Sequence, residues 1–257
     1  LEPRGEWPPA WANDLAGAYS NRGNARGDGG DLGGALADCD RAIALREALR
    51  DRLEPQGEWS PAWANDLAAA YVNRGVARGD GNDLSGELAD YGQAIDLMEG
   101  LRQRLGAEWP PAWANELAAA YVNRGVTRCA GNDLGGALAD YDRAIALMEG
   151  LRQRLGAEWP PAWANDLAKA YANRGAARRA GNDLSGALAD YDRAIDLMEA
   201  VRDRLEPRGE WPPAWANDLA RAYSSRGIAR GDGGDLGGAL ADHGQAIDLM
   251  EALRDRL

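Results

Sequence analysis

The chain has few of the side chains from which enzymes build catalytic and metal sites. Its 257 residues include one histidine, His243, and two cysteines, Cys39 and Cys129, which lie far apart in the sequence. Because catalysis needs a clustered nucleophile and base, and a metal needs several converging ligands, we expect no enzyme activity, no metal site and no cofactor. Two unpaired thiols are typical of a protein from a reducing cytoplasm.

Long apolar runs and basic side chains are also scarce. No stretch reaches the roughly 18 consecutive apolar residues that a membrane helix needs, and the N-terminus lacks the charged-then-apolar pattern of a signal peptide. We therefore expect a soluble, cytoplasmic protein without membrane contact. The 41 acidic against 29 basic residues give a net charge of -12, and Lys169 is the only lysine. Nucleic acid is not an expected partner, because a polyanion would be repelled at long range.

What the sequence has instead is a repeat. Pairs of tryptophans recur at offsets of 52, 50, 50 and 52 residues. The pairs are Trp7/Trp11, Trp59/Trp63, Trp109/Trp113, Trp159/Trp163 and Trp211/Trp215. They divide the chain into five repeats, 1–53, 54–105, 106–155, 156–205 and 206–257. A period of this size predicts a solenoid, in which each repeat buries its apolar face against its neighbours. We expect one elongated domain, residues 1–257, that is a fragment of a longer array, because both ends fall within the pattern.

The sequence of each repeat predicts two helices and no strand. The first helix begins at a proline pair such as Pro8-Pro9, whose second proline fits the first helical position, and it ends at a glycine-containing loop. The second helix begins at an aspartate that can cap its first turn. These aspartates are Asp31, Asp83, Asp133, Asp183 and Asp235. In repeat 2 an apolar stripe follows, through Leu84, Leu88, Tyr91, Ile95, Met98, Leu101 and Leu105. The predicted fold class is all-α, with ten helices in five helix-turn-helix repeats.

Repeat 2 contains a 34-residue frame, starting at Ala68, that resembles the tetratricopeptide repeat (TPR). Positions 4, 8, 17, 24 and 27 of this frame are Tyr71, Gly75, Leu84, Tyr91 and Ala94. The other repeats carry the same frame, and the run NRGxAR…DLxGALADYDRAI is similar to its common bacterial form. The resemblance implies an α-solenoid wound into a right-handed superhelix, here in a long variant with 16 to 18 extra residues per repeat. Small residues at positions 8 and 20 imply a close crossing of the two helices, where Glu87 of repeat 2 either tilts outward or strains the crossing.

The resemblance further implies that the first helix of each repeat faces a partner through positions 2, 5, 6, 9, 12 and 13. Position 6 is an asparagine in four repeats, namely Asn21, Asn73, Asn123 and Asn173. A column of amides can hold an extended peptide backbone, although the same amides can equally solvate the groove or tie neighbouring helices together. At the other groove positions, repeats 2 and 3 offer the apolar residues Val72, Val76, Val122 and Val126, and repeats 4 and 5 add the cations Lys169 and Arg221. A peptide with an apolar segment followed by an acidic one fits this gradient, unless the positions merely drift among copied repeats.

Two columns of arginine recur at positions 7 and 11. In repeat 2 they are Arg74 and Arg78. The favoured interpretation is that they pair with the equally regular aspartates of the second helices, such as Asp90, and so bind adjacent repeats together; an anion site is the alternative.

These patterns favour a non-catalytic protein-interaction scaffold that binds an extended peptide or partner segment in the groove. Two alternatives stay open. The nearly identical repeats can also self-associate head to tail as a structural module, or serve as the regulatory or sensor arm of a larger bacterial enzyme.

Overall fold

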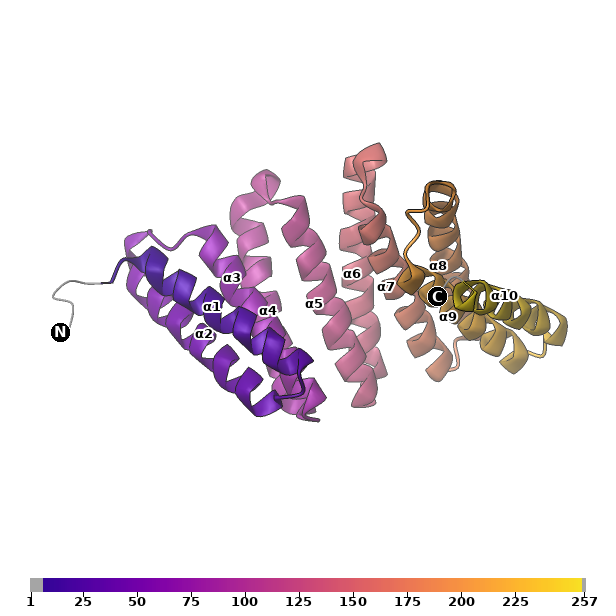
Figure 1. The fold of residues 1–257 in the computed structure, drawn as a ribbon, viewed down its shortest axis with the longest axis horizontal. Coiled ribbons are helices and arrows are strands. Elements are labelled where there is room, and N and C mark those ends of the chain that lie inside the picture. Colours follow the sequence, from indigo (N-terminus) through magenta and orange to yellow (C-terminus); the bar gives the residue numbers. More distant parts are fainter. Residues whose placement is uncertain (1–6, 256–257) are drawn as a thin grey trace. The chain divides into compact units, whose positions relative to one another are not determined.

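The computed structural model describes residues 7–255, and within that range the chain forms ten α-helices and no strand (Figure 1). The chain divides into two compact halves, of which the first ends at Thr127 and the second begins at Arg128. The first half contains α1 (Pro9–Asp28), α2 (Leu32–Leu53), α3 (Pro61–Asp80), α4 (Leu84–Leu105) and most of α5 (Pro111–Ala130). The second contains α6 (Leu134–Leu155), α7 (Pro161–Ala180), α8 (Leu184–Leu205), α9 (Pro213–Asp232) and α10 (Leu236–Arg254). The predicted all-α fold of ten helices is confirmed.

Within each half, consecutive helices pack against one another. In the first half α1 contacts α2, α2 contacts α3, and α3 contacts α4. The second half has the same order of contacts, from α6 through α7, α8 and α9 to α10. First helices of neighbouring repeats also touch, α1 with α3 and α7 with α9. Each repeat is joined to the next by a short 3-10 helix that the sequence analysis did not predict, and these are η1 (Glu54–Gln56), η2 (Gly106–Glu108), η3 (Gly156–Glu158) and η4 (Glu206–Arg208).

The predicted helix ends are confirmed. Helices α1, α3, α5, α7 and α9 each begin at the second residue of the Pro-Pro or Ser-Pro pair. Each second helix follows a capping aspartate, and the Asp83 carboxylate accepts a hydrogen bond of 3.0 Å from the Gly86 amide. The loop between the first and second helix of a repeat contains one residue in the left-handed conformation. It is Asn82 in repeat 2, with φ of 61°, and Gly30 in repeat 1, with φ of 81°. Asparagine and glycine are the residues that adopt this conformation at low cost.

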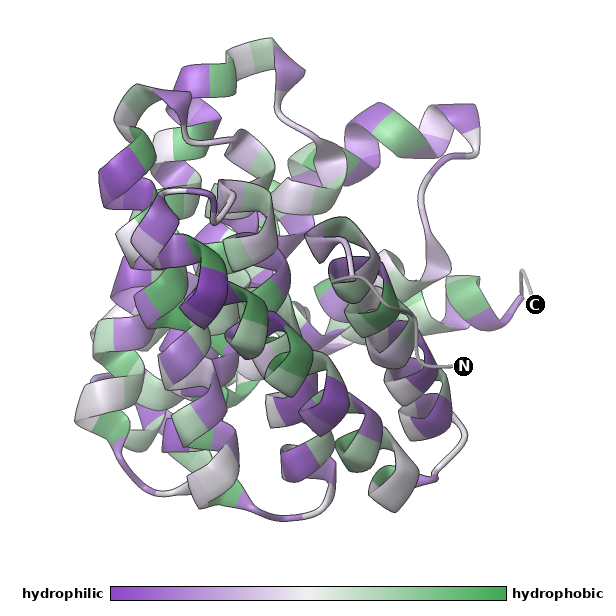
Figure 2. Cartoon of the chain, turned by 90° about the vertical axis from the view of Figure 1, so that its left-hand side faces the viewer, coloured by the Kyte–Doolittle hydropathy of each residue, from purple (hydrophilic) through white to green (hydrophobic). Residues whose placement is uncertain are grey.

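The helices carry both apolar and polar residues, and both hydropathy colours appear around single helices in Figure 2. In the predicted stripe of α4, the middle residues Tyr91, Ile95, Met98 and Leu101 are buried. The stripe is exposed at its start, because Leu84 lies in the first turn and is 39% accessible. In repeats 3, 4 and 5 the two tryptophans of each pair pack edge to face. The ring centroids of Trp109 and Trp113, for example, lie 5.7 Å apart. The tryptophan pairs therefore contribute to packing.

The close crossing of paired helices is confirmed at Gly175. A Cβ atom there would lie 3.2 Å from the Ala187 carbonyl oxygen and 3.0 Å from the ring of Tyr191, so only glycine lets the two backbones approach this far. In repeat 2 the Glu87 side chain lies over Gly79, where a Cβ atom would come within 2.8 Å of its carboxyl group. Glu87 is half-buried, and its carboxyl group lies against α3 within the helix pair. The crossing stays close, because a Cβ atom at Gly75 would come within 2.8 Å of the Tyr91 ring.

Candidate functional site

The groove positions of two neighbouring first helices meet in the second half of the chain. A hollow of about 290 Å³ lies between α7 and α9, with Met198 of α8 also in its lining. Asn173 and Ser225, both at position 6, line it together with Lys169 and Arg221, both at position 2. The predicted residues Asn173, Lys169 and Arg221 are thus brought into one site.

A second hollow, of about 350 Å³, lies in the first half between α1, α2 and α3. Asn73 and Val76 of α3 line it, opposite Asn24 of α1. Its lining also includes Cys39, whose thiol has a raised pKa because it is buried. Asn73 and Val76 therefore face the same space.

The remaining predicted groove residues line neither hollow. Asn21 is exposed on α1, while Val72, Val122 and Asn123 are half-buried on α3 and α5. Val126 is 49% accessible. These side chains lie on solvent-accessible parts of first helices, but the hollows do not collect them into one site.

The α7–α9 hollow contains two cations, Lys169 and Arg221, but only one of their charges is uncompensated. The Lys169 ammonium group lies 3.0 Å from a carboxylate oxygen of Asp218, which neutralises it. The same carboxylate oxygen accepts a hydrogen bond from the Asn165 amide at 3.4 Å. Among residues 7–255, Arg221 forms no ion pair and is exposed, so it carries the site's uncompensated positive charge.

The arginine columns are engaged in structural pairs. Arg74 donates to both carboxylate oxygens of Asp90 at 2.9 and 2.6 Å, and Arg78 lies 2.9 Å from the same group. Arg74 also contacts Asp40 of the preceding repeat at 2.8 Å and stacks over the Tyr71 ring with 5.3 Å to its centroid. The equivalent sets are Arg174 with Asp190 and Asp142, and Arg226 with Asp242 and Asp192.

The prediction that the Asp90 column joins adjacent repeats is therefore wrong. Asp90 pairs with arginines of its own repeat, and the tie to the neighbour comes from the column that begins with Asp40. The reason is helical geometry: Asp38 and Asp40 stand two residues apart and so point about 200° apart around α2. Asp38 consequently faces its own first helix, and Asp40 faces the next one.

The sequence analysis did not predict a second asparagine column, which begins with Asn13 in the segment Trp11-Ala12-Asn13-Asp14 and recurs at Asn65. Asn13 donates to Asp66 at 3.1 Å, and Asn65 donates to Glu116 at 2.9 Å. Each bond joins the first helix of one repeat to the first helix of the next, which fixes their register. The signal was present in the sequence, because an Asn followed by Asp or Glu recurs in every repeat within an otherwise apolar face.

Repeat 1 differs from the others at one buried place. Arg46 stands where repeats 2 to 5 have methionine, and it is 5% accessible. It donates to Asn13 Oδ1 at 3.2 Å and to Ser20 Oγ at 3.1 Å, and burial lowers its pKa. In the methionine repeats the corresponding Oδ1 atoms of Asn65 and Asn165 are buried without a hydrogen-bond partner in the part of the chain described.

No group of three or more histidine, cysteine, aspartate or glutamate side chains among residues 7–255 is arranged to hold a metal ion. No helix in the same range is both long and apolar enough to cross a bilayer.

Solved structures of other proteins have a similar fold. No family model and no curated protein matches the chain. Solved structures do match, among them the crystal structure of BtubC (BKLC) from P. vanneervenii, with 18% identity, a TM-score of 0.58, and 97% of this chain and 93% of that chain covered. The chain has a tetratricopeptide-like fold. The apo form of RapI shares this TPR-like arrangement at 8% identity and a TM-score of 0.57, over 94% of this chain and 85% of its own. A crystal structure of MamA is 18% identical at a TM-score of 0.50, with 91% and 96% covered.

Proposed function

We propose that this TPR-like chain is a protein-interaction scaffold that holds an extended partner segment along its first helices. The observation that carries the proposal is the α7–α9 hollow, where residues at the same frame positions of two neighbouring first helices line one open space. Asn173 and Ser225 place a side-chain amide and a hydroxyl beside four alanines and Met198 in the same lining. An extended segment needs this combination, because its backbone requires hydrogen-bond partners and its side chains require space.

The α1–α3 hollow supports the same proposal in the first half of the chain. Asn73 lines it next to Val76, so an amide again adjoins an apolar side chain. The arginine columns do not compete for this role, since Arg74 and Arg78 are already paired with buried Asp90. Recognition is thus assigned to amides and small apolar side chains.

The test begins with a peptide selected from a random displayed library on the wild-type chain. We expect Asn73→Ala/Asn123→Ala to weaken its binding by about 10-fold or more, because each lost hydrogen bond is worth about 1 kcal/mol and about 1.4 kcal/mol is tenfold in Kd. Gln93→Ala/Gln103→Ala is the matched control, since it removes two exposed amides from α4. Equal affinity for all three proteins, with unchanged helicity, would refute the asparagine column.

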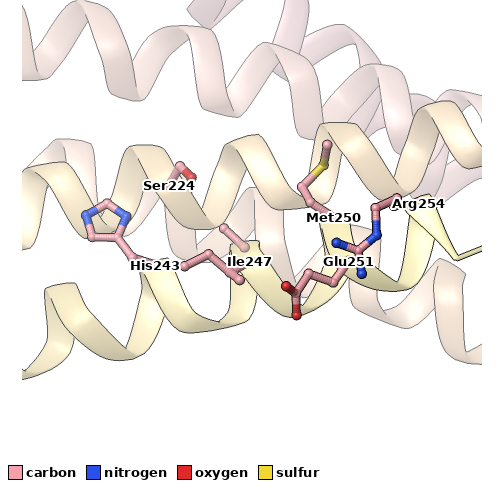
Figure 3. A pocket seen from close by; sticks show the side chains of 7 residues that line it. Ser224, His243, Ile247, Met250, Glu251 and Arg254 are labelled. Atoms are coloured by element: carbon pink, nitrogen blue, oxygen red, sulfur yellow. The ribbon is translucent and has the colours of Figure 1, made fainter.

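Head-to-tail association is the second candidate, favoured by the outer face of α9 and α10. Ser224, His243, Ile247, Met250, Glu251 and Arg254 border an open hollow of about 540 Å³ there (Figure 3). Ile247 is 57% accessible, whereas its equivalent Ile195 is covered by the following repeat and is 2% accessible. Trp11 on α1 is likewise 60% accessible.

A second copy would continue the contacts that already join consecutive repeats. Tyr223 donates to Glu199 of the preceding repeat at 2.8 Å, and Tyr71 donates to Glu47 at 2.6 Å. Tyr19 of one copy and Glu251 of another are the corresponding donor and acceptor. Sedimentation velocity over a concentration series should show growing oligomers for this chain and a monomer for Ile247→Glu; a wild-type monomer at every concentration excludes this candidate.

A further inference from the structure

The α7–α9 hollow exists where two valines of the earlier repeats are replaced by alanine. Ala172 and Ala176 line it, at the positions that are Val72 and Val76 in repeat 2. Each replacement removes two methyl groups from the groove side of α7. Half of the ten residues that line the hollow are apolar, namely Met198 and four alanines, and the other half are polar or charged.

The size of the hollow limits what it can hold. Pockets that enclose a drug-sized molecule measure about 300 to 1,000 Å³. This hollow, at about 290 Å³, is at the lower limit of that range, and it lies open between two first helices. It therefore suits a side chain of a longer ligand better than an entire small molecule.

The polar groups at its edge define the chemistry beside that side chain. Asn173 offers an amide donor and acceptor, and Ser225 offers a hydroxyl, both suited to peptide backbone groups. Asp218 is occupied by Lys169 at 3.0 Å, so neither of these two charges is left for a ligand. Arg221 remains, exposed and without an ion pair in the described residues, and its charge is complementary to a carboxylate.

We propose that the α7–α9 hollow is a specificity site that accepts one apolar side chain of an extended peptide and pairs an adjacent aspartate or glutamate of that peptide with Arg221. This inference rests on the proposed function and narrows it. The apolar and the acidic elements of the ligand belong at one place, between repeats 4 and 5, and not in separate halves of the groove. The chain's net charge of -12 repels acidic ligands at long range, so the Arg221–carboxylate pair adds little to overall affinity. Its contribution is selectivity for peptides with an acidic residue at this position.

Short synthetic peptides with a glycine-serine background serve as probes, with Leu-Asp, Leu-Lys or Ser-Asp at the centre. Each is titrated into the labelled full chain, and backbone amide shifts are followed by NMR. We expect the Leu-Asp peptide to shift the backbone amide signals of Ala172, Ala176 and Ser225. It should bind about 2- to 5-fold more tightly than Leu-Lys, which is the range expected for an exposed ion pair. Ser-Asp should bind more weakly than Leu-Asp, because it leaves the hollow empty.

Two variants separate the apolar and the charged contribution. Ala172→Val/Ala176→Val narrows the hollow with side chains that repeat 2 already carries, so the fold is retained and the Leu-Asp peptide should bind more weakly. Arg221→Ala should leave the Leu peptides bound but remove their preference for aspartate. Ala162→Val, an exposed position on the same helix, is the control for adding valine and should change nothing.

The outcomes distinguish this site from the proposed function. Equal binding of Leu-Asp and Leu-Lys, or an affinity for Leu-Asp that Ala172→Val/Ala176→Val leaves unchanged, overturns the specificity site. If the probe then shifts α3 residues such as Asn73, the scaffold function still stands. If neither the probes nor any library-selected peptide shifts a first-helix residue, both proposals are wrong.

Discussion

Removing the Asp90 carboxylate should be among the most destabilising single changes in the first half of the chain. The Asp90 side chain is 2% accessible and is shared by Arg74 and Arg78, at 2.6 and 2.9 Å. Asp90→Ala leaves two guanidinium groups at the helix crossing without their common partner. Arg74 keeps one other carboxylate, that of Asp40.

The magnitude follows from how much water reaches each group. Breaking a buried ion pair by removing one partner costs about 3 to 5 kcal/mol. The Arg74 and Arg78 side chains are 17% and 26% accessible, so they recover part of their hydration, and we expect the low end, about 3 kcal/mol. Asp40 is 59% accessible, and Asp40→Ala should cost at most about 1 kcal/mol although it removes a contact to the same arginine.

Urea denaturation, followed by circular dichroism and tryptophan fluorescence, measures both variants against the wild type. Repeat proteins unfold with energies that couple neighbouring repeats, so the curves are fitted with nearest-neighbour terms. Asp40→Ala is the matched control, because it changes the same residue type on a neighbouring second helix. A cost below about 1 kcal/mol for Asp90→Ala, or a cost equal to that of Asp40→Ala, would contradict the assignment of Asp90 as the buried centre of the pair.

Three further outcomes are expected. Arg46→Met should not lower the free energy of unfolding by more than about 1 kcal/mol, since replacing a buried charge by an apolar side chain is often neutral or stabilising; urea denaturation checks this. Asp133→Ala should cost about 1 kcal/mol through the lost cap of α6, measured the same way. Burial, with a neighbouring glutamate, raises the pKa of Tyr71 and of Tyr223 to about 12 from 10.0, so their contribution to stability is complete below pH 10.0 and is lost as pH rises through 12. Tyrosinate absorbance should therefore appear later in the folded chain than in urea, and coincident titrations would contradict it.

The fold was predictable because its determinants are local and repeated five times. Pro61 and Asp83 mark the starts of α3 and α4, and the left-handed loop residue is Asn or Gly in every repeat. Backbone conformation at such places depends on the residue itself, so the sequence is sufficient. Gly175 similarly indicates a close helix crossing, because no larger residue fits there.

The partners of long charged side chains were not predictable in the same way. Arg74 reaches aspartates in two repeats, and which of them is buried depends on how far around α2 and α4 each aspartate points. Lys169 was expected to present its charge to a ligand, and its pairing with Asp218 depends on the spacing of α7 and α9. Arg46 was visible in the sequence as an exception to the methionine column, but its partners are set by tertiary packing.

The asparagine side chains of the first helices offer the most direct test of the proposed function. Their amide NH₂ groups give their own NMR signals, which respond to hydrogen bonding with a ligand. With a library-selected peptide at saturation, the signals of Asn73, Asn123 and Asn173 should shift, while those of Gln93 on α4 stay in place. Shifts confined to second-helix side chains, with the three asparagine signals unmoved, would contradict a partner-binding groove on the first helices.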